Sequence, residues 1–214
     1  MIRHHSLLGA CIVGVAALPG FPSVGAAQRQ IEVVPFVGLY IPTANVIDQF
    51  DSACSCQVAA KQHTAIDVGG RVVAWVTDRL GLEGAFGFSP SGATATAPGY
   101  APIDRSGRVI TTSARLLAAL GPRTRNRYFY VSGGIGLVVR GGDAWAGTSG
   151  RTRLAGAIGA GVRVELAPPL ALRAELADVF YSTQFSTAST PPTQSQFQHD
   201  LVLSLGLAVP VGGH

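Results

Sequence analysis

The sequence is poor in charge. Charged residues make up 13% of its 214 residues, whereas soluble globular domains carry about 25%. Lysine occurs once, as Lys61, so the formal net charge of +4 rests on dispersed arginines. A surface in full contact with water would be poorly supplied with charge, and the scattered positive charge provides no basic patch for a nucleic acid. We expect no nucleic-acid partner.

The sequence also lacks long apolar runs beyond its N-terminal segment. Hydrophobic residues make up 47% of the chain, yet no later stretch approaches the roughly 18 consecutive apolar residues of a spanning helix. In the N-terminal segment, Arg3 precedes the apolar run 7–18, and residues 24–27 are small enough for cleavage. We therefore expect a signal peptide at 1–27 and one mature domain at 28–214.

The chain shows instead an alternation of apolar and small or polar residues with a period of two, which is typical of β-strands. Within 127–166, one face carries large apolar residues and the other carries glycine, alanine and arginine. The polar face of a soluble sandwich would be expected to carry lysine, glutamate and threonine. A face of glycine, alanine and arginine is typical of the cramped interior of a closed barrel whose outer surface meets lipid.

Eight segments show this alternation, and short turns separate them in alternation with long connections. Each segment has about 10 to 13 residues, enough to cross a bilayer on a tilted path of about 9 to 11 residues. The pattern predicts an all-β fold, an eight-stranded antiparallel up-and-down transmembrane β-barrel. The expected strands are 31–40, 65–77, 80–88, 108–120, 127–140, 153–166, 170–181 and 198–209, and the expected long loops are 43–63, 90–106, 141–150 and 185–195.

The chain resembles the small eight-stranded bacterial outer-membrane β-barrel proteins, the group of OmpA-like and OmpX-like barrels. The first strand, Val34-Pro35-Phe36-Val37-Gly38, and the last strand, His199-Asp200-Leu201-Val202-Leu203-Ser204-Leu205-Gly206, carry this resemblance. It implies a porin-like membrane protein in the bacterial outer membrane, a monomer surrounded by outer-membrane lipid and lipopolysaccharide, and no catalytic residue. The chain ends in Gly-Gly-His, whereas members of the group commonly end in an aromatic residue that the insertion machinery reads.

Charged side chains gather on the predicted inward faces. Since the lumen of an eight-stranded barrel is about wide enough for side chains to fill, these charges are expected to pair with one another or with trapped water. Arginine suits such a plug because its planar fork binds carboxylates and stays charged. A narrow ion pathway or gate is the alternative. The predicted members are Glu32, Asp67, Arg71, Glu83, Arg115, Arg140, Arg153, Arg163, Glu165, Arg173, Glu175 and Asp200.

Two cysteines, Cys54 and Cys56, fall in the first long connection and are candidates for a disulfide, with each other or between two molecules, in an oxidising compartment. The alternative is a metal site that adds Asp51 or His63 to the two thiolates. Structural zinc sites need about four ligands, so we expect no metal.

Glycine clusters and one histidine raise the question of chemistry. The stretch Gly133-Gly134-Ile135-Gly136 resembles part of a dinucleotide fingerprint, but it does not lead from a strand into a helix, so we expect no cofactor. His199 and Ser204 lie five residues apart on one strand and therefore on opposite faces. They cannot form a catalytic pair, and the chain is not expected to be an enzyme.

Aromatic residues, only 7% of the chain, fall near strand ends. Tyr40, Phe88, Phe180 and Tyr181 lie at predicted loop-side ends, and Tyr128 and Phe129 lie at a turn-side start. Such positions are typical of the aromatic girdles of membrane barrels.

We expect a non-enzymatic outer-membrane barrel with a structural, adhesive or surface-binding role through its extracellular loops. The segment 142–149, which contains Trp145, is the best place to look for a bound extracellular ligand. One alternative is a small channel for ions or apolar solutes. Another is a soluble lipocalin-like ligand-binding barrel, in which the apolar faces would turn inward.

Overall fold

The computed structural model describes residues 31–51, 55–123, 126–148, 150–184 and 195–211. The predicted signal peptide lies outside these ranges. Among the described residues, no helix has the length and apolar character to cross a membrane.

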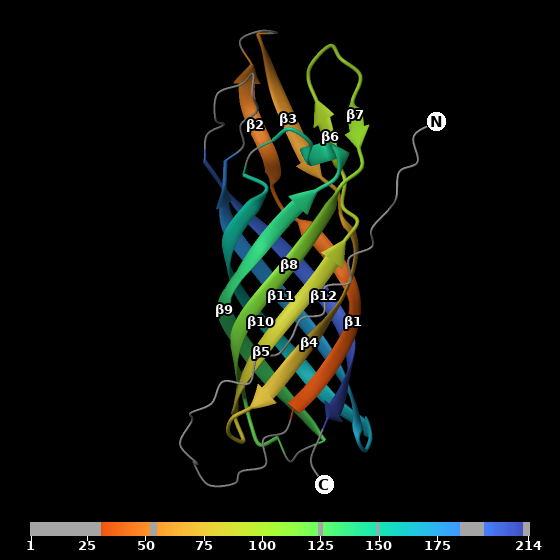
Figure 1. Cartoon of the computed structure of the whole chain (residues 1–214), viewed down its shortest axis with the longest axis vertical. Helices are drawn as coiled ribbons and strands as arrows, with labels where there is room; N and C mark the ends of the chain where they lie inside the picture. The colour runs from red at the N-terminus through yellow and green to blue at the C-terminus, as the bar shows by residue number, and fades with distance from the viewer. Residues whose placement is uncertain (1–30, 52–54, 124–125, 149, 185–194, 212–214) are drawn as a thin grey trace, which may run out of the picture.

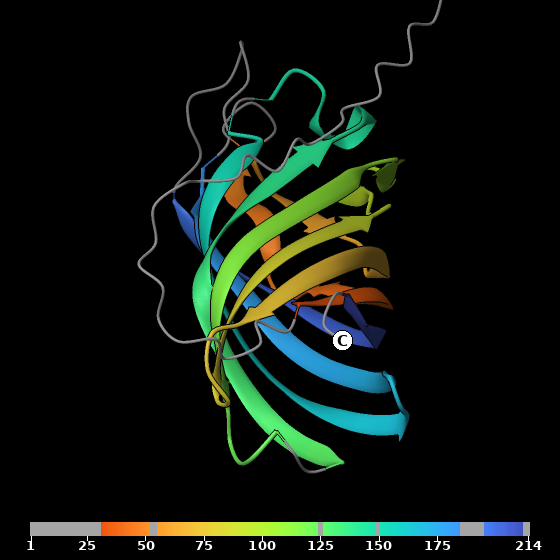
Figure 2. The same ribbon diagram turned by 60° about the horizontal axis from the view of Figure 1, so that its bottom comes forward.

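Eight antiparallel strands close into a barrel in the order β1-β12-β11-β10-β9-β8-β5-β4, with β4 paired to β1. Figures 1 and 2 show the strands tilted around a common axis. The predicted fold class and all eight predicted strands are confirmed, with ends that differ by one or a few residues. The barrel strands are β1 (Ile31–Pro42), β4 (Ala65–Trp75), β5 (Leu80–Ser89), β8 (Arg108–Ala119), β9 (Arg127–Gly141), β10 (Thr152–Ala167), β11 (Leu170–Thr183) and β12 (Gln196–Val211).

The alternation of the sequence sets the two faces of the barrel wall. In β1, Val34 and Tyr40 point inward and are fully buried, whereas Val37 between them is 54% exposed. The same holds around the barrel, where Leu116 and Ile135 are more than 60% exposed on the outer face. An outer wall of leucine, isoleucine and valine is stable only against an apolar surrounding.

A second sheet extends the barrel at one end, and the sequence did not predict it. The expected loops 43–63 and 90–106 contain β2 (Asn45–Asp51), β3 (Cys56–Gln62), β6 (Ala93–Thr96) and β7 (Ile103–Arg105), which pair in the order β2-β3-β6-β7. Figure 1 shows this sheet projecting from the loop side of the barrel. These strands are short and rich in alanine, threonine and polar residues, so their alternation is weak. Their pairing with one another stabilises them.

The third long connection, between β9 and β10, contains the 3-10 turn η1 (Asp143–Trp145). It packs Trp145 against Val46 and Ala93 of the second sheet. Trp145 is only 3% exposed, so it closes the junction between barrel and sheet.

The lumen is filled in layers. An apolar and aromatic cluster lies toward the turn side and contains Trp75, Leu117 and Tyr128. A second cluster lies toward the loop side and contains Tyr40, Val138 and Tyr181. Between them lies a layer of charged side chains.

Candidate functional site

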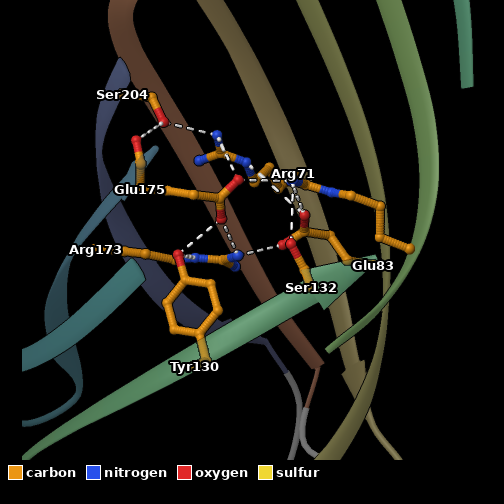
Figure 3. Close-up of polar contacts among 8 residues, drawn as sticks. Arg71, Glu83, Tyr130, Ser132, Arg173, Glu175 and Ser204 are labelled. Carbon is orange, nitrogen blue, oxygen red and sulfur yellow. Dashed lines mark hydrogen bonds and ion pairs between the residues drawn. The ribbon is translucent and has the colours of Figure 1, made fainter. Parts of the chain in front are cut away.

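Glu175, on β11, is the centre of the charged layer. Its carboxylate accepts hydrogen bonds from the Tyr130 hydroxyl and the Arg173 guanidinium, each at 2.7 Å. It also forms ion pairs with Arg115 at 2.8 Å and Arg71 at 3.5 Å. Figure 3 shows the side chains of Arg71, Tyr130 and Arg173 converging on Glu175.

Glu83, on β5, is the second carboxylate of this layer. It forms ion pairs with Arg173 at 2.6 Å, with Arg71 at 3.9 Å and with Arg115. Three guanidinium groups therefore share two carboxylates. All five side chains are nearly inaccessible to solvent, and a buried charge is costly unless it is paired. The layer is thus a closed ion-pair cluster.

Uncharged partners complete this cluster, and the sequence analysis did not include them in the predicted lumen network. The Ser204 hydroxyl accepts a hydrogen bond from Arg71 at 2.7 Å, and Ser132 accepts one from Arg115 at 3.3 Å. The Tyr130 hydroxyl also accepts from Arg173 Nε at 2.6 Å. Their inward positions in the alternation could have identified them, because a hydroxyl on the inward face lies beside the buried charges.

A second polar group lies closer to the loop side. The Asp200 carboxylate accepts hydrogen bonds from the hydroxyls of Tyr40 and Tyr181, each at 2.5 Å. Arg140 lies 3.8 Å from the same carboxylate and donates to Gln62 at 3.2 Å. Above it, the Trp145 ring centroid is 5.4 Å from the Arg140 guanidinium carbon. Barrel mouth and second sheet therefore meet at Arg140.

At the turn side, Glu32 forms ion pairs with Arg163 at 3.5 Å and with Arg123 at 3.8 Å. The Arg123 guanidinium lies 3.9 Å from the Trp75 ring centroid. Arg123 was not among the predicted members because it lies in the β8–β9 turn, where the period-two pattern has ended.

Three predicted members stand apart from these clusters. Asp67 accepts a hydrogen bond from Ser89 at 2.8 Å. Arg153 donates to the Gln184 carbonyl at the loop-side end of β10. Glu165, two residues before the other end of β10, is half-buried and forms no ion pair with a described residue. Arg153 and Glu165 lie near strand ends, where the lumen opens.

The central layer leaves little space in the lumen. A cavity of about 40 Å³ adjoins it and is lined in part by Asp67, Arg71, Arg115 and Glu175. A volume of this size holds a few water molecules. Water there would satisfy polar atoms such as Arg71 Nη1 and Asp67 Oδ2, which have no hydrogen-bond partner among the described residues.

The second sheet forms a pocket of about 210 Å³ on one of its faces. One row of paired residues crosses all four strands, Ile47 to Ala60 to Ala95 to Ile103. The two central residues of this row are alanines, and their short side chains leave the space above the sheet that forms the pocket. Trp145 of η1 lines the pocket beside them. Trp145 belongs to the segment 142–149, which the sequence analysis named as the place to look for a ligand, whereas the floor comes from residues expected to be loop.

The opposite face of the same sheet is polar. Lys61 pairs with Thr94, and Thr94 pairs with Asp104. His63 Nε2 lies 2.6 Å from the Thr94 hydroxyl and 3.7 Å from the Asp104 carboxylate. The sheet is thus amphipathic, with one face suited to water and one suited to an apolar surface.

Cys56 is disulfide-bonded. Its predicted partner, Cys54, lies outside the described residues. A sulfur in a disulfide is not a thiolate, so Cys56 cannot serve the alternative metal site in this state. No group of three potential metal-binding residues occurs in the part of the chain that the structure describes.

His199 and Ser204 point to opposite faces of β12, as the spacing requires. Ser204 is buried in the lumen, while His199 lies on the outer wall and its Nδ1 is 2.8 Å from Asp178 Oδ2. Asp178 of β11 also points outward. β11 keeps a regular register with both neighbours at Asp178, so no bulge places the carboxylate there, and the pair with His199 accommodates it.

The predicted aromatic girdle is only partly present. Phe129 is exposed on the outer wall, and Phe180 packs there against Phe197 with ring centroids 6.2 Å apart. Tyr40, Tyr128 and Tyr181 are buried in the lumen. The prediction considered only how close these residues lie to a strand end. Whether a residue occupies an inward or an outward position in the alternation decides which face of the wall it lies on.

Comparison with known proteins identifies the architecture. Residues 13–207 match the family described as outer membrane protein beta-barrel domain. The chain belongs to this family. The protein therefore lies in the bacterial outer membrane, and its apolar outer wall meets membrane lipid. The soluble lipocalin-like alternative is wrong, because the apolar faces point outward.

Solved structures show the same fold. The chain is similar to OprG from Pseudomonas aeruginosa, with a TM-score of 0.65, 10% identity and coverage of 86% of this chain and 97% of that one. It is also similar to AlkL in lipid bilayers (TM-score 0.57, 16% identity, 92% and 98% covered) and to Escherichia coli outer membrane protein W (TM-score 0.53, 13% identity, 86% and 98% covered). No curated protein matches the chain.

Proposed function

We propose that the protein binds a small apolar ligand or apolar side chain at the cell surface, in the pocket between the second sheet and η1. The observation that carries this proposal is the row Ile47, Ala60, Ala95 and Ile103, walled by Trp145. A pocket lined mainly by apolar groups gains affinity by excluding water from a ligand of the same character.

The barrel then serves as the membrane anchor. The cluster around Glu175 and Glu83 fills the middle of the lumen, and Arg140 with Asp200 fills its mouth. This filling supports a plugged barrel over a channel for ions or apolar solutes. The second sheet, built from the long connections, faces the outside.

The proposed role involves no catalysis. The imidazole of His199 and the carboxylate of Asp178 form a pair on the outer wall. A nucleophilic mechanism would add a hydroxyl or thiol in contact with the imidazole. Among the residues that the structure covers, no hydroxyl hydrogen-bonds the His199 ring; the Thr43 hydroxyl donates to the His199 backbone carbonyl instead.

Quenching of tryptophan fluorescence tests the binding site. The chain has two tryptophans, so a Trp75→Phe variant in lipid nanodiscs leaves Trp145 as the sole tryptophan, which excitation at a wavelength that tyrosine does not absorb selects. We expect 1-bromohexane to quench this emission with saturation. An Ala95→Leu substitution, which fills the pocket floor, should abolish the saturable part.

The matched control is Thr96→Leu, which adds a similar side chain to the other face of β6 and should leave quenching unchanged. If the Ala95→Leu protein is quenched as strongly as the control, the pocket is not the binding site.

A further inference from the structure

A cleft opens on the outer wall of the barrel, just below the second sheet. It has a volume of about 330 Å³ and lies across β8, β9 and the start of β10. Its upper lining contains Arg108 and Arg151, and its lower lining contains Ile110 and Val139. Arg140, whose guanidinium pairs with Asp200 in the lumen, also belongs to the lining. The cleft is therefore basic on one side and apolar on the other.

The two arginines differ from those of the lumen. Each lumen arginine of the clusters described above, such as Arg115 or Arg163, has a carboxylate partner. Arg108 and Arg151 are exposed, and neither forms an ion pair with any residue the structure covers. Asp143 of the adjoining η1 accepts a hydrogen bond from the Ser106 hydroxyl at 3.0 Å. Two positive charges in one cleft thus lack a counter-charge from the protein.

The backbone holds these side chains on both sides of β9. Arg108 pairs with Gly141, and the Arg151 carbonyl accepts from the Arg140 backbone N–H at 2.9 Å. Adjacent strands lie about 4.8 Å apart, so the two arginines flank β9 at about 10 Å. Arg151 lies opposite the lumen residue Arg140, but it precedes β10 and is exposed, and its side chain lines the same cleft as Arg108. Both guanidinium groups are therefore available to one tetrahedral anion in this cleft.

Gly141 makes this arrangement possible. A Cβ added there would lie 3.1 Å from Arg108 Nε, so a side chain would push the guanidinium off the strand. The next residue, Gly142, has a φ of 92°, a left-handed conformation that glycine adopts without strain. Thr152 adds a hydroxyl to the same lining.

The lower side of the cleft continues into the membrane-facing wall. Ile110 and Val139 are paired neighbours on β8 and β9 and point outward. Below them, Leu137 and Leu116 belong to the exposed apolar wall. A ligand that fits this gradient has an anionic head and apolar chains. In the outer leaflet, the lipid of that chemistry is the phosphorylated lipid A part of lipopolysaccharide.

We propose that Arg108 and Arg151 bind a phosphate group of lipid A, with its acyl chains lying on the wall formed by Ile110 and Val139. The site would orient the barrel at the outer leaflet and hold one lipid beside β9. It is separate from the apolar pocket of the second sheet, since it needs neither Trp145 nor the alanine floor.

Native mass spectrometry of the full refolded chain in detergent micelles tests the site. The probe is bisphosphorylated lipid A, and its dephosphorylated form tests the need for phosphate. We expect the protein to retain one lipid A and little of the dephosphorylated lipid. The Arg108→Ala/Arg151→Ala double variant should bind lipid A with about a 10- to 100-fold lower apparent affinity, because hydrogen bonds to charged groups contribute more binding free energy than neutral ones.

Two controls keep the test sharp. Arg127→Ala removes an exposed arginine at the opposite end of the barrel and should bind like the unmodified protein. The Arg108→Lys/Arg151→Lys variant keeps both charges and should recover most of the affinity. Heat-modifiable migration on gels verifies that each variant is folded.

Three results would overturn the proposal. They are equal binding of lipid A by the double alanine variant, equal binding of the dephosphorylated lipid, and displacement of lipid A by inorganic phosphate at the concentration of the lipid. The last result would assign the arginines to a free anion. None of the three results affects quenching of Trp145, so the proposal for the apolar pocket is tested independently.

Discussion

Removing the Glu175 carboxylate is the most direct test of the plugged lumen. The side chain is 1% exposed and contacts Tyr130 and three arginines at 2.7 to 3.5 Å. A Glu175→Ala substitution leaves those three guanidinium groups with Glu83 alone. Breaking a buried ion pair from one side costs about 3 to 5 kcal/mol, because the remaining charges stay buried without compensation.

The measurement is urea unfolding in lipid vesicles, followed by loss of the fast-migrating folded band on unboiled gels. With a slope of about 2 kcal/mol per M, the midpoint should fall by roughly 2 M.

Two further variants give the comparison its meaning. Glu165→Ala removes the same charge from a side chain that has no ion pair with a described residue, and it should change stability by about 0.5 kcal/mol or less. The Arg173→Met/Glu175→Leu double variant removes one charge of each sign and should lose less stability than Glu175→Ala. If Glu175→Ala and Glu165→Ala unfold at the same urea concentration, the ion-pair cluster does not hold the lumen together.

Three other outcomes follow from the structure. Planar-bilayer recordings of the protein should show little or no steady conductance, since side chains fill the lumen, and a large stable pore would contradict the plug. Gly134→Ala should destabilise the barrel by about 1 to 3 kcal/mol, because the added Cβ would lie 2.7 Å from Arg115 Cα. Gly133→Ala places its Cβ in open space and should be tolerated. Equal urea midpoints for the two variants would refute this. Mass spectrometry of the non-reduced chain should show a mass two hydrogens below the thiol form through Cys56, without retained metal.

The register between strands could not be predicted from the sequence. Glu83 pairs with Arg115 across β5 and β8, which are separated by a long connection. The sequence places both residues on inward faces, but a shift of one pair of residues would bring different charges together. Closure of the barrel decides the shift, and with it the three-to-two ratio of arginines to carboxylates around Glu175.

The second sheet was missed for a related reason. Its strands are only three to seven residues long, and the row through Ala60 and Ala95 is apolar without being large. Such segments gain stability only when their neighbours complete the ladder and Trp145 covers one face. No single segment of the sequence carries that information.

What the sequence alone determined is the barrel wall. Successive side chains of a strand point to opposite faces, so the period-two pattern assigns each residue of β9 or β12 to lipid or lumen before any contact is known. The tertiary structure decided which charges meet, where Asp178 finds His199, and how η1 closes the barrel mouth. These depend on contacts between residues far apart in the chain, such as Arg140 and Asp200, which only the closed sheet brings within reach.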